Sequence, residues 1–412
     1  MKPGAASVTK MLSFEQALSE VEARLAAASF VPATEVVPLS QVWGRILAED
    51  VNADRDYPPF NRSTRDGFAV HSEDVRHANS ALTLAGEVRA GEYFKAEVKA
   101  AHCVAIMTGA PLPAGTDAVV MMEHTRTQGS KVEIERPAAS FENVVRKGSE
   151  AQAGKHILPK GRRLRVGEIG LLASVGKGNV AVYVRPRVAI IPTGEEIVPI
   201  EHKPEWYQVR NSNSAMLAAA VARAGGIPWE IGIGPDQKEA LRGLIEKGLE
   251  ADLLLLSGGV SMGKYDFVED VLGDLGAEFY FQSVAIRPGK PLVFGRVQRR
   301  FFFGLPGNPV SSFVTCTLFA RPAIEALMGG KFERPSLLRA RLAQSVRHKA
   351  GLTTFTPARI ENRNAGPVVS LVGWQGSGDL VGVAEANGFL VVHPEQPGPE
   401  VGDWVDVMLM AS

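Results

Sequence analysis

Hydrophobic and polar residues follow different periods along the chain, and these periods divide it into segments. Residues 13–28 carry apolar side chains at helical spacing, and Ser13 followed by Gln16 is typical of a capping box at a helix start. From about residue 51 to residue 148, short alternating runs separated by Gly and Pro turns predict a small β-rich domain. A further helix is predicted over residues 166–175, after the β-rich segment has ended.

Strand and helix patterns alternate regularly between residues 185 and 331. Predicted strands cover 188–191, 227–233, 253–256 and 301–303, an antiparallel pair covers 279–286 and 292–297, and predicted helices cover 214–224, 236–250, 266–275 and 310–328. We expect Asp236 to cap the second of these helices. This alternation is typical of a mostly parallel sheet with helices on both faces.

After residue 331 the helical pattern stops, and strand patterns return. They cover 337–346, 353–360, 368–372, 388–392 and 404–410. Several short strands in close succession predict a compact terminal β-domain.

Composition fits a folded chain of several domains. At 412 residues and 45% hydrophobic content, the chain is too long for one ordinary core. Lys and Arg (45) balance Asp and Glu (45), so the charge favours neither nucleic acid nor a membrane surface as a partner. No apolar run approaches a membrane span, and residues 1–10 lack the apolar core of a secretory signal. Cys103 and Cys316 lie in apolar segments, so we expect a protein of the reducing cytoplasm.

The most informative stretch follows the leucine run at 253–256. Its residues are small or polar: Ser257, Gly258, Gly259, Ser261 and, at the end, Asp266. In open α/β sheets, ligands bind at the carboxyl ends of strands. A backbone with few side chains lets a phosphate or a polar ring approach closely. A plain strand-to-helix turn would have the same composition, so both interpretations stay open at this point.

Three other turns place polar chemistry next to predicted strands. The turn 192–196 ends with two carboxylates, which suit hydrogen-bond donors of a ligand. Arg287 and Lys290 share a tight turn, where their mutual repulsion favours an anion such as phosphate or molybdate. Residues 304–312 lead into a helix whose free N–H groups attract anions, without the Lys of a Walker loop. Each of these turns could instead be purely structural.

Two common hydrolase types are not expected. The eight His residues are scattered, with no His pair four residues apart for zinc. The Gly-x-Ser-x-Gly elbow of serine hydrolases is absent as well.

Six segments in a fixed order carry a resemblance to a known family. They are Ser63–Ala69 (STRDGFA), Met107–Pro113 (MTGAPLP), Pro192–Glu196 (PTGEE), Ser257–Gly263 (SGGVSMG), Arg287–Pro291 (RPGKP) and Gly304–Ser311 (GLPGNPVS). Together they resemble the molybdopterin molybdenumtransferases of the MoeA type and the E domain of gephyrin. The resemblance covers nearly the whole chain.

The resemblance implies an elongated α+β chain of four domains. Residues 7–50 and 149–184 would form a discontinuous linker and dimerisation domain. Residues 51–148 would form a β-rich domain that contributes to the partner's active site. Residues 185–331 would form the α/β molybdopterin-binding domain with a three-layer, mostly parallel sheet, and residues 332–412 a β-barrel-like domain. The family also implies a head-to-tail homodimer.

The implied reaction is the last step of molybdenum cofactor biosynthesis. Molybdate is inserted into adenylyl-molybdopterin with Mg²⁺, and AMP is released. Implied protein partners are a molybdopterin adenylyltransferase, which would supply the substrate, and molybdoenzymes, which would receive the product.

The resemblance also implies roles for individual residues. Asp66 and Thr108 would reach the active site of the partner subunit. Glu196 would hold the pterin or the nucleotide, and Asp236 and Asp266 would hold Mg²⁺. The implied substrate-binding residues are Ser257, Gly258, Gly259, Ser261, Arg287, Lys290, Pro306, Gly307, Asn308, Pro309 and Ser311, with Arg359 and Ser377 from the terminal domain.

The chain departs from the family pattern at several of these motifs. Arg287 stands where the family more often has Lys, and Lys264 stands where an acid is usual. Because Arg forks its donors and is more weakly hydrated than Lys, we expect oxyanion binding to persist with altered geometry.

Two other functions stay open. The α/β segment alone could serve a molybdopterin adenylyltransferase or a nucleotide pyrophosphatase, but segments 51–148 and 332–412 exceed what that activity needs. The chain could also be a non-catalytic scaffold. The carboxylates Asp66, Asp236 and Asp266 argue against a scaffold without an active site.

Overall fold

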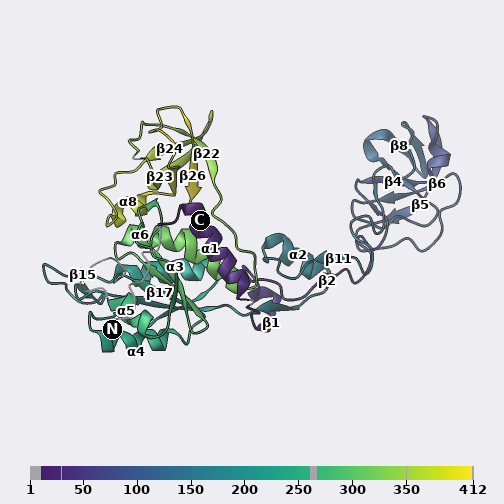
Figure 1. Cartoon of the computed structure of the whole chain (residues 1–412). Helices are drawn as coiled ribbons and strands as arrows, with labels where there is room; N and C mark the ends of the chain where they lie inside the picture. Colours follow the sequence, from purple (N-terminus) through teal and green to yellow (C-terminus); the bar gives the residue numbers. More distant parts are fainter. Residues whose placement is uncertain (1–10, 29, 260–266, 349, 411–412) are drawn as a thin grey trace. The chain divides into compact units, whose positions relative to one another are not determined.

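The computed structural model describes residues 11–28, 30–259, 267–348 and 350–410, which fold into two compact units (Figure 1). The larger unit combines the chain up to residue 36, residues 44–48 and the chain from residue 181 onward. The smaller unit combines residues 37–43 and 49–180. Each unit is described by itself below.

A mixed sheet with the strand order β16-β13-β17-β21-β20-β18 forms the centre of the larger unit. Its strands are β13 (Arg187–Pro192), β16 (Ile227–Glu230), β17 (Leu253–Ser257), β18 (Glu278–Phe281), β20 (Val293–Val297) and β21 (Arg300–Leu305). Strands β16, β13, β17 and β21 are parallel to one another, and β20 and β18 extend the sheet in antiparallel fashion. The predicted mostly parallel sheet is therefore confirmed.

Helices cover both faces of this sheet, because alternate strand residues point to opposite sides. Leu253 and Leu255 pack in a core with residues from α1 (Phe14–Ala27), α3 (Ser212–Ala224), α6 (Pro309–Thr315) and α7 (Arg321–Leu327). Leu254 and Leu256 pack instead with α4 (Lys238–Gly248) and α5 (Phe267–Asp274). Figure 1 shows α3 on one side of β17, and α4 and α5 on the other. The result is the expected three-layer arrangement.

The structure corrects three of the predicted details. The Asp236 cap is wrong: the cap position of α4 is Gln237, and the Asp236 N–H points instead to the Glu195 carboxylate (3.1 Å). The predicted helix 310–328 is divided by a π-helical stretch, Cys316–Ala320, which ends two residues before Pro322, a residue without a backbone N–H. Finally, β19 (Ile286–Arg287) leaves the expected antiparallel pair and joins the terminal sheet, where it is parallel to Thr353–Thr354.

The terminal sheet closes on itself, as expected for a barrel. Its order is β19-β23-β24-β22-β26-β25, and an additional pairing joins β25 back to β23. The strands are β22 (Leu338–Leu342), β23 (Thr353–Arg363), β24 (Gly366–Leu371), β25 (Gly388–Val392) and β26 (Trp404–Leu409), with the short helix α8 (Leu380–Glu385) between β24 and β25. Closure leaves fewer free strand edges than an open sheet of the same size.

The smaller unit is built on a sheet with the order β7-β4-β6-β5-β9-β8. Its strands are β4 (Gly67–Val70), β5 (Ser80–Val88), β6 (His102–Ile106), β7 (Ala118–Met121), β8 (Thr125–Gln128) and β9 (Lys131–Ile134). The chain also has the helix α2 (Val166–Ser174) and short strand pairs: β1 (Thr34–Pro38) with β12 (Asn179–Tyr183), β2 (Val51–Asn52) with β11 (His156–Leu158), β3 (Arg62–Ser63) with β10 (Val144–Val145), and β14 (Ile197–Val198) with β15 (Val209–Arg210). The predicted β-rich texture is confirmed.

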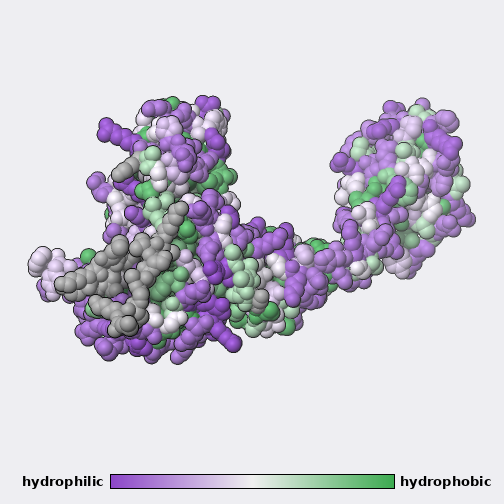
Figure 2. Space-filling model, viewed as in Figure 1, coloured by the Kyte–Doolittle hydropathy of each residue, from purple (hydrophilic) through white to green (hydrophobic). Residues whose placement is uncertain are grey.

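On the face drawn in Figure 2, hydrophilic residues predominate and hydrophobic ones are scattered among them. Among the described residues, no helix combines the length and apolarity that crossing a bilayer requires.

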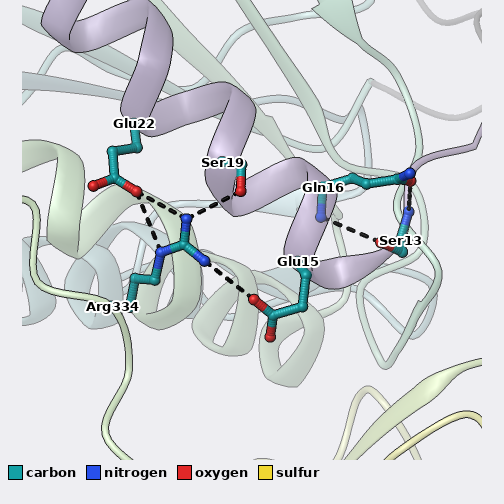
Figure 3. A network of polar contacts seen from close by, with 6 residues as sticks. All are labelled: Ser13, Glu15, Gln16, Ser19, Glu22 and Arg334. Carbon is teal, nitrogen blue, oxygen red and sulfur yellow. Dashed lines mark hydrogen bonds and ion pairs between the residues drawn. The ribbon is translucent and has the colours of Figure 1, made fainter.

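Helix α1 is tied to the segment that leads into the terminal sheet. Its predicted capping box is confirmed, because the Gln16 N–H donates to Ser13 Oγ (3.2 Å) and the Ser13 N–H donates to Gln16 Oε1 (3.0 Å). On the next turns, Arg334 reaches back to this helix and donates to Glu15 (3.2 Å), Ser19 (3.0 Å) and Glu22 (2.9 Å) (Figure 3). One guanidinium therefore connects the linker 331–337 to residues more than 300 positions earlier.

We predict that Arg334→Ala loosens α1. Because this network is partly exposed, we expect a loss of about 1 kcal/mol, or roughly fivefold faster amide exchange in α1. The difference should shrink in about 1 M salt, where exposed charges are screened. Hydrogen–deuterium exchange measures both effects. Arg363→Ala, which removes an exposed pair with Glu361, should leave α1 unchanged. Equal exchange in Arg334→Ala and the native protein would contradict the prediction.

Candidate functional site

Three parallel strands of the central sheet end at the same level. Pro192 of β13 pairs with Ser257 of β17, and Ser257 pairs with Leu305 of β21. The ladder continues one step into the loops, where the Thr193 N–H donates to Ser257 O (2.8 Å) and the Gly258 N–H to Leu305 O (3.0 Å). The three loops that follow these strands are consequently held side by side.

A cavity of about 1370 Å³ lies over these loops, within the larger unit. Its walls come from the loop after β13, the start of α3, the glycine loop after β17, the loop after β19, and the turn between β21 and α6. The terminal domain adds residues 374–378. This last segment is tied to the start of α6, because the Val310 N–H donates to Ser377 O (2.9 Å) and Asn308 Nδ2 to Ser377 Oγ (2.9 Å).

Glycine is required in the loop after β17. Gly258 and Gly259 have φ angles of +94° and +63°, in the left-handed region that favours glycine. A Cβ atom on Gly258 would lie 2.5 Å from Thr193 O, and one on Gly307 would lie 3.5 Å from the Gly258 Cα. The backbones of two loops therefore meet at the base of the cavity with no side chain between them.

Two cations line the same cavity. Arg287 and Lys290 are exposed, and within the described part of the chain neither side chain has an ion pair or a hydrogen bond. Gly289 between them has a φ of +110°, and a Cβ there would lie 2.6 Å from a methyl group of Thr315. A tight turn thus presents two unneutralised charges, and their repulsion is relieved by a bound anion.

Carboxylates approach the cavity from another wall. Glu196 and Asp236 both line it, and the Glu195 carboxylate accepts a hydrogen bond from the Asp236 N–H. A Cβ atom on Gly194 would lie 2.6 Å from the Glu196 carboxylate, so this glycine makes room for the acid. Cations and acids therefore share one space, which suits a substrate that carries both anions and a metal ion.

Most of the site residues implied by the resemblance come together here. Those that line the cavity are Glu196, Asp236, Gly258, Gly259, Arg287, Lys290, Pro306, Gly307, Asn308, Pro309, Ser311 and Ser377. Ser257 is fully buried below the cavity, and Arg359 is exposed on β23 outside its lining. Ser261 and Asp266 lie outside the described residues.

The lining also includes residues that the sequence interpretation missed. Arg210, Asn211, Ser212 and Asn213 form a continuous stretch of the wall. Asn211 caps α3, since its side chain accepts a hydrogen bond from the Ser214 N–H (3.1 Å). The signal was the Asn-Ser-Asn run itself, because Asn and Ser favour helix caps and would have started this helix two residues before Ser214.

The described residues offer little to a mechanism based on thiols or on a preformed metal cluster. Burial raises the pKa of both Cys103 and Cys316 to about 12, which keeps these thiols protonated. Within the described ranges, no group of three or more His, Cys, Asp or Glu side chains is arranged to hold a metal ion.

Asp66 and Thr108 belong to the smaller unit, where they contact each other. Asp66 Oδ1 accepts hydrogen bonds from the Thr108 N–H (2.6 Å) and from the Thr108 hydroxyl (2.9 Å). These bonds, led by the one from the backbone, lower the pKa of the exposed Asp66 carboxyl. Thr108 therefore holds the Asp66 carboxylate in place and favours its ionised form on the surface of the unit.

We predict that Thr108→Val raises the pKa of Asp66 part of the way to its usual value. The hydroxyl bond is lost, whereas the stronger backbone bond remains. A lowered carboxyl pKa stabilises the folded state above the ordinary pKa of Asp, and this stabilisation disappears as the pH falls through the lowered value. The variant should lose it at higher pH than the native protein.

Carboxyl NMR titration of Asp66 provides the measurement. Asp50, whose pKa is lowered mainly by the Lys160 backbone N–H, is the internal control and should titrate identically in both proteins. An unchanged Asp66 titration would show that the hydroxyl bond contributes nothing.

Comparison with known proteins places this chain in a family. A molybdopterin molybdenumtransferase of Staphylococcus epidermidis is 35% identical over 381 residues, which cover 91% of each chain. The chain belongs to the molybdopterin molybdenumtransferase family. A relative of the same name from Nostoc sp. is 36% identical over 375 residues, covering 87% of this chain and 85% of the relative. Membership in this family of transferases confirms the resemblance carried by the six ordered motifs.

Three family descriptions match successive parts of this molybdenumtransferase-family chain. Residues 12–176 match the MoeA N-terminal region (domain I and II), residues 189–326 match the probable molybdopterin binding domain, and residues 339–410 match the MoeA C-terminal region (domain IV). The crystal structure of a molybdopterin biosynthesis MoeA protein from Pyrococcus horikoshii has a TM-score of 0.81 at 30% identity. It covers 97% of this chain and 100% of its own. The cavity described above lies mainly on the part that matches the molybdopterin-binding description.

Proposed function

We propose that this chain inserts molybdate into adenylyl-molybdopterin and releases AMP, as the last step of molybdenum cofactor biosynthesis. The observation that carries the proposal is one cavity lined by bare glycine backbone, by two carboxylates, and by two cations that have no ion-pair partner among the described residues. Family membership supplies the class of substrate, since the relatives are named molybdopterin molybdenumtransferases.

Arg287 and Lys290 would bind molybdate, which enters as a substrate. Both side chains line the cavity without a carboxylate partner among the described residues, so their donors are available to an oxyanion. Arg offers a planar fork and Lys a compact point charge. Together they would hold a tetrahedral dianion in one orientation, ready for transfer to the dithiolene sulfurs.

The bare loops would hold the phosphorylated part of the substrate. Gly258, Gly259 and Gly307 expose main chain at the carboxyl ends of β17 and β21, where ligands of α/β sheets bind. Ser311 and the Pro306–Pro309 turn form the adjoining wall. Hydrolysis of the pyrophosphate bond would consume one water and leave AMP and the pterin phosphate. Binding of molybdate by the two dithiol sulfurs would displace one oxo group, which leaves as water with the two thiol protons.

The carboxylates fit a magnesium ion that is completed by the substrate. Mg²⁺ is usually held by one or two carboxylates together with phosphate oxygens, rather than by a cage of protein ligands. Asp236 lines the same cavity as the bare loops, and Asp266, which lies outside the described residues, would be the second ligand. When bound, Mg²⁺ would neutralise charge that develops on the pyrophosphate. Glu196 would accept hydrogen bonds from the pterin or nucleotide.

The Asp66–Thr108 pair would complete the site from a second copy of the chain. Its exposure and its low carboxyl pKa support a role toward a ligand or a metal ion. A head-to-tail homodimer, a cytoplasmic location and exchange with an adenylyltransferase and with recipient molybdoenzymes stay predictions.

The direct test supplies purified full-length chain with adenylyl-molybdopterin, Mg²⁺ and molybdate. We expect AMP release and a product that activates a molybdenum-free molybdoenzyme. In Asp236→Asn, AMP release should fall about 100-fold, since the charge that balances the metal is lost.

Asp274→Asn is the matched control, because Asp274 is an exposed carboxylate at the far end of α5 that pairs with Lys238. Substrate binding by the native protein without AMP release would instead support a scaffold. Full activity of Asp236→Asn would remove this residue from the mechanism.

We further predict that Arg287→Ala combined with Lys290→Ala weakens molybdate use about 100-fold, because two charge-assisted contacts are lost. AMP release at saturating substrate should change far less. Titration with molybdate, or with tungstate as a surrogate, measures the binding. The control is Arg299→Ala with Lys247→Ala. It removes the same charge at the amino ends of the strands, opposite the cavity, and should have no effect. Equal loss of molybdate use and AMP release would argue against a dedicated oxyanion site.

A further inference from the structure

One amide side chain on α3 joins the end of β17 to the turn between β21 and α6 at the base of the cavity. Asn213, in the first turn of α3, donates from Nδ2 to Ser257 Oγ (2.8 Å) at the end of β17 and to Gly307 O (2.8 Å) in the turn before α6. Its side chain is 6% exposed in total and belongs to the cavity lining. Asn213 on α3 therefore links the strand that leads into the first glycine-rich loop to the second glycine-rich loop.

The orientation of this amide follows from its partners. A backbone carbonyl only accepts, so the NH₂ group must face Gly307 O, and Oδ1 must point away from it. The Oδ1 atom is buried and has no hydrogen-bond partner among the described residues. Thr193 Oγ1, beside Gly258 and Gly259 in the same region, is also buried and has no partner in the part of the chain that the structure describes. Because unpaired buried acceptors cost free energy, stability alone does not account for a polar residue here.

Ser257 transmits the contact to the next helix. Its side chain is fully buried, and its hydroxyl lies 3.1 Å from Ser312 Oγ and 3.3 Å from Pro306 O. The resemblance implies that Ser257 binds substrate, but its side chain faces the protein interior and does not line the cavity. The Ser257 oxygen accepts the hydrogen bond from Asn213 Nδ2, and the Ser257 hydroxyl donates to Pro306 O in the β21–α6 turn.

We infer that Asn213 is a positioning residue for the proposed transfer, acting with Ser257 to set the spacing between the Gly258 and Gly307 backbones. The inference rests on the proposed function, since these backbones are where the phosphorylated part of the substrate would lie. An ångström of displacement at such a place costs up to about 100-fold in rate. The cations are positioned differently, through the pairing of β19 with β23. Loss of Asn213 should therefore affect turnover and spare molybdate binding.

The experiment compares full-length native protein with Asn213→Ala, Asn213→Asp, Ser257→Ala and the double variant Asn213→Ala/Ser257→Ala. Asn213→Asp keeps the shape of the side chain and loses its N–H donors. If kcat falls equally in Asn213→Asp and Asn213→Ala, neither charge nor volume causes the loss of activity. We expect kcat for AMP release to fall about 30- to 100-fold, with the KM for molybdate within about threefold of the native value. Because both residues act in one network, the double variant should be within about threefold of the poorer single variant.

Ser72→Ala is the matched control. Ser72 is also buried, and its hydroxyl donates to Asp117 (2.8 Å) in the smaller unit. The variant loses this bond, and its kcat for AMP release should equal that of the native protein. A purely structural role for Asn213 would lower the folded fraction but leave kcat per folded molecule unchanged, and this result would overturn the inference. So would a raised KM for molybdate at native kcat, or multiplicative losses in the double variant.

Hydrogen exchange separates this inference from the proposed function. If the native protein releases no AMP, the proposed reaction fails, but the spacing can still be measured. Asn213→Ala should then speed exchange of the Gly258 amide, which donates to Leu305 O, by about tenfold relative to the native chain. Exchange in the terminal strand β25 should stay the same. Unchanged exchange at Gly258 would show that Asn213 does not hold the loops.

Discussion

The site depends on the alignment of three parallel strand ends. Pro192, Ser257 and Leu305 pair across β13, β17 and β21, and each next residue opens a loop at the cavity. Hydrophobicity cannot set this register by itself, because the leucines of β17 are buried on both faces and a one-residue slip would exchange one leucine for another. The polar groups at the carboxyl end of β17 can specify this register. The Thr193 and Gly258 N–H groups and the Asn213 Nδ2 group all find acceptors in the observed alignment.

Within that frame, opposite charges arrive on separate pieces of backbone. The acids come from the loop after β13 and the approach to α4, and the cations come from the turn after β19. Because the charges lie on different supports, they do not collapse into ion pairs with one another. Neither Arg287 nor Lys290 has a salt bridge to any described residue. The cavity thus keeps the two cations available to a ligand, at the cost of a less stable empty state.

Sequence reasoning predicted those parts in which a single local pattern decides the outcome. Periodicity and the Ser13–Gln16 box were enough for α1, and a short leucine run between turn residues was enough for β17. It failed where a long-range contact decides. The Glu195 carboxylate takes the Asp236 N–H, so the cap position moves to Gln237, and β19 has two residues, too few to show any period. Ser257 could point inward or outward with equal plausibility until Asn213 and Ser312 were seen beside it. The ordered motifs located the cavity more completely than the helix and strand patterns did, because they reflect all of these contacts at once.

The pairing of β19 with β23 has a mechanical consequence. Ile286 and Arg287 lie along Thr353 and Thr354, and the Thr353 N–H donates to Ala285 O (3.0 Å), so the backbone beneath the first cation is an edge of the terminal barrel. The central sheet keeps all of its own ladders without that barrel. The cation turn would lose its pairing with β23 and keep local bonds such as the one from the Val284 N–H to Lys290 O (3.0 Å). A fragment ending after α7 would thus retain the glycine loops of the cavity, while the turn that carries Arg287 and Lys290 would lack its strand partner. The terminal barrel thus supports the backbone of a site whose lining residues come mostly from other parts of the chain.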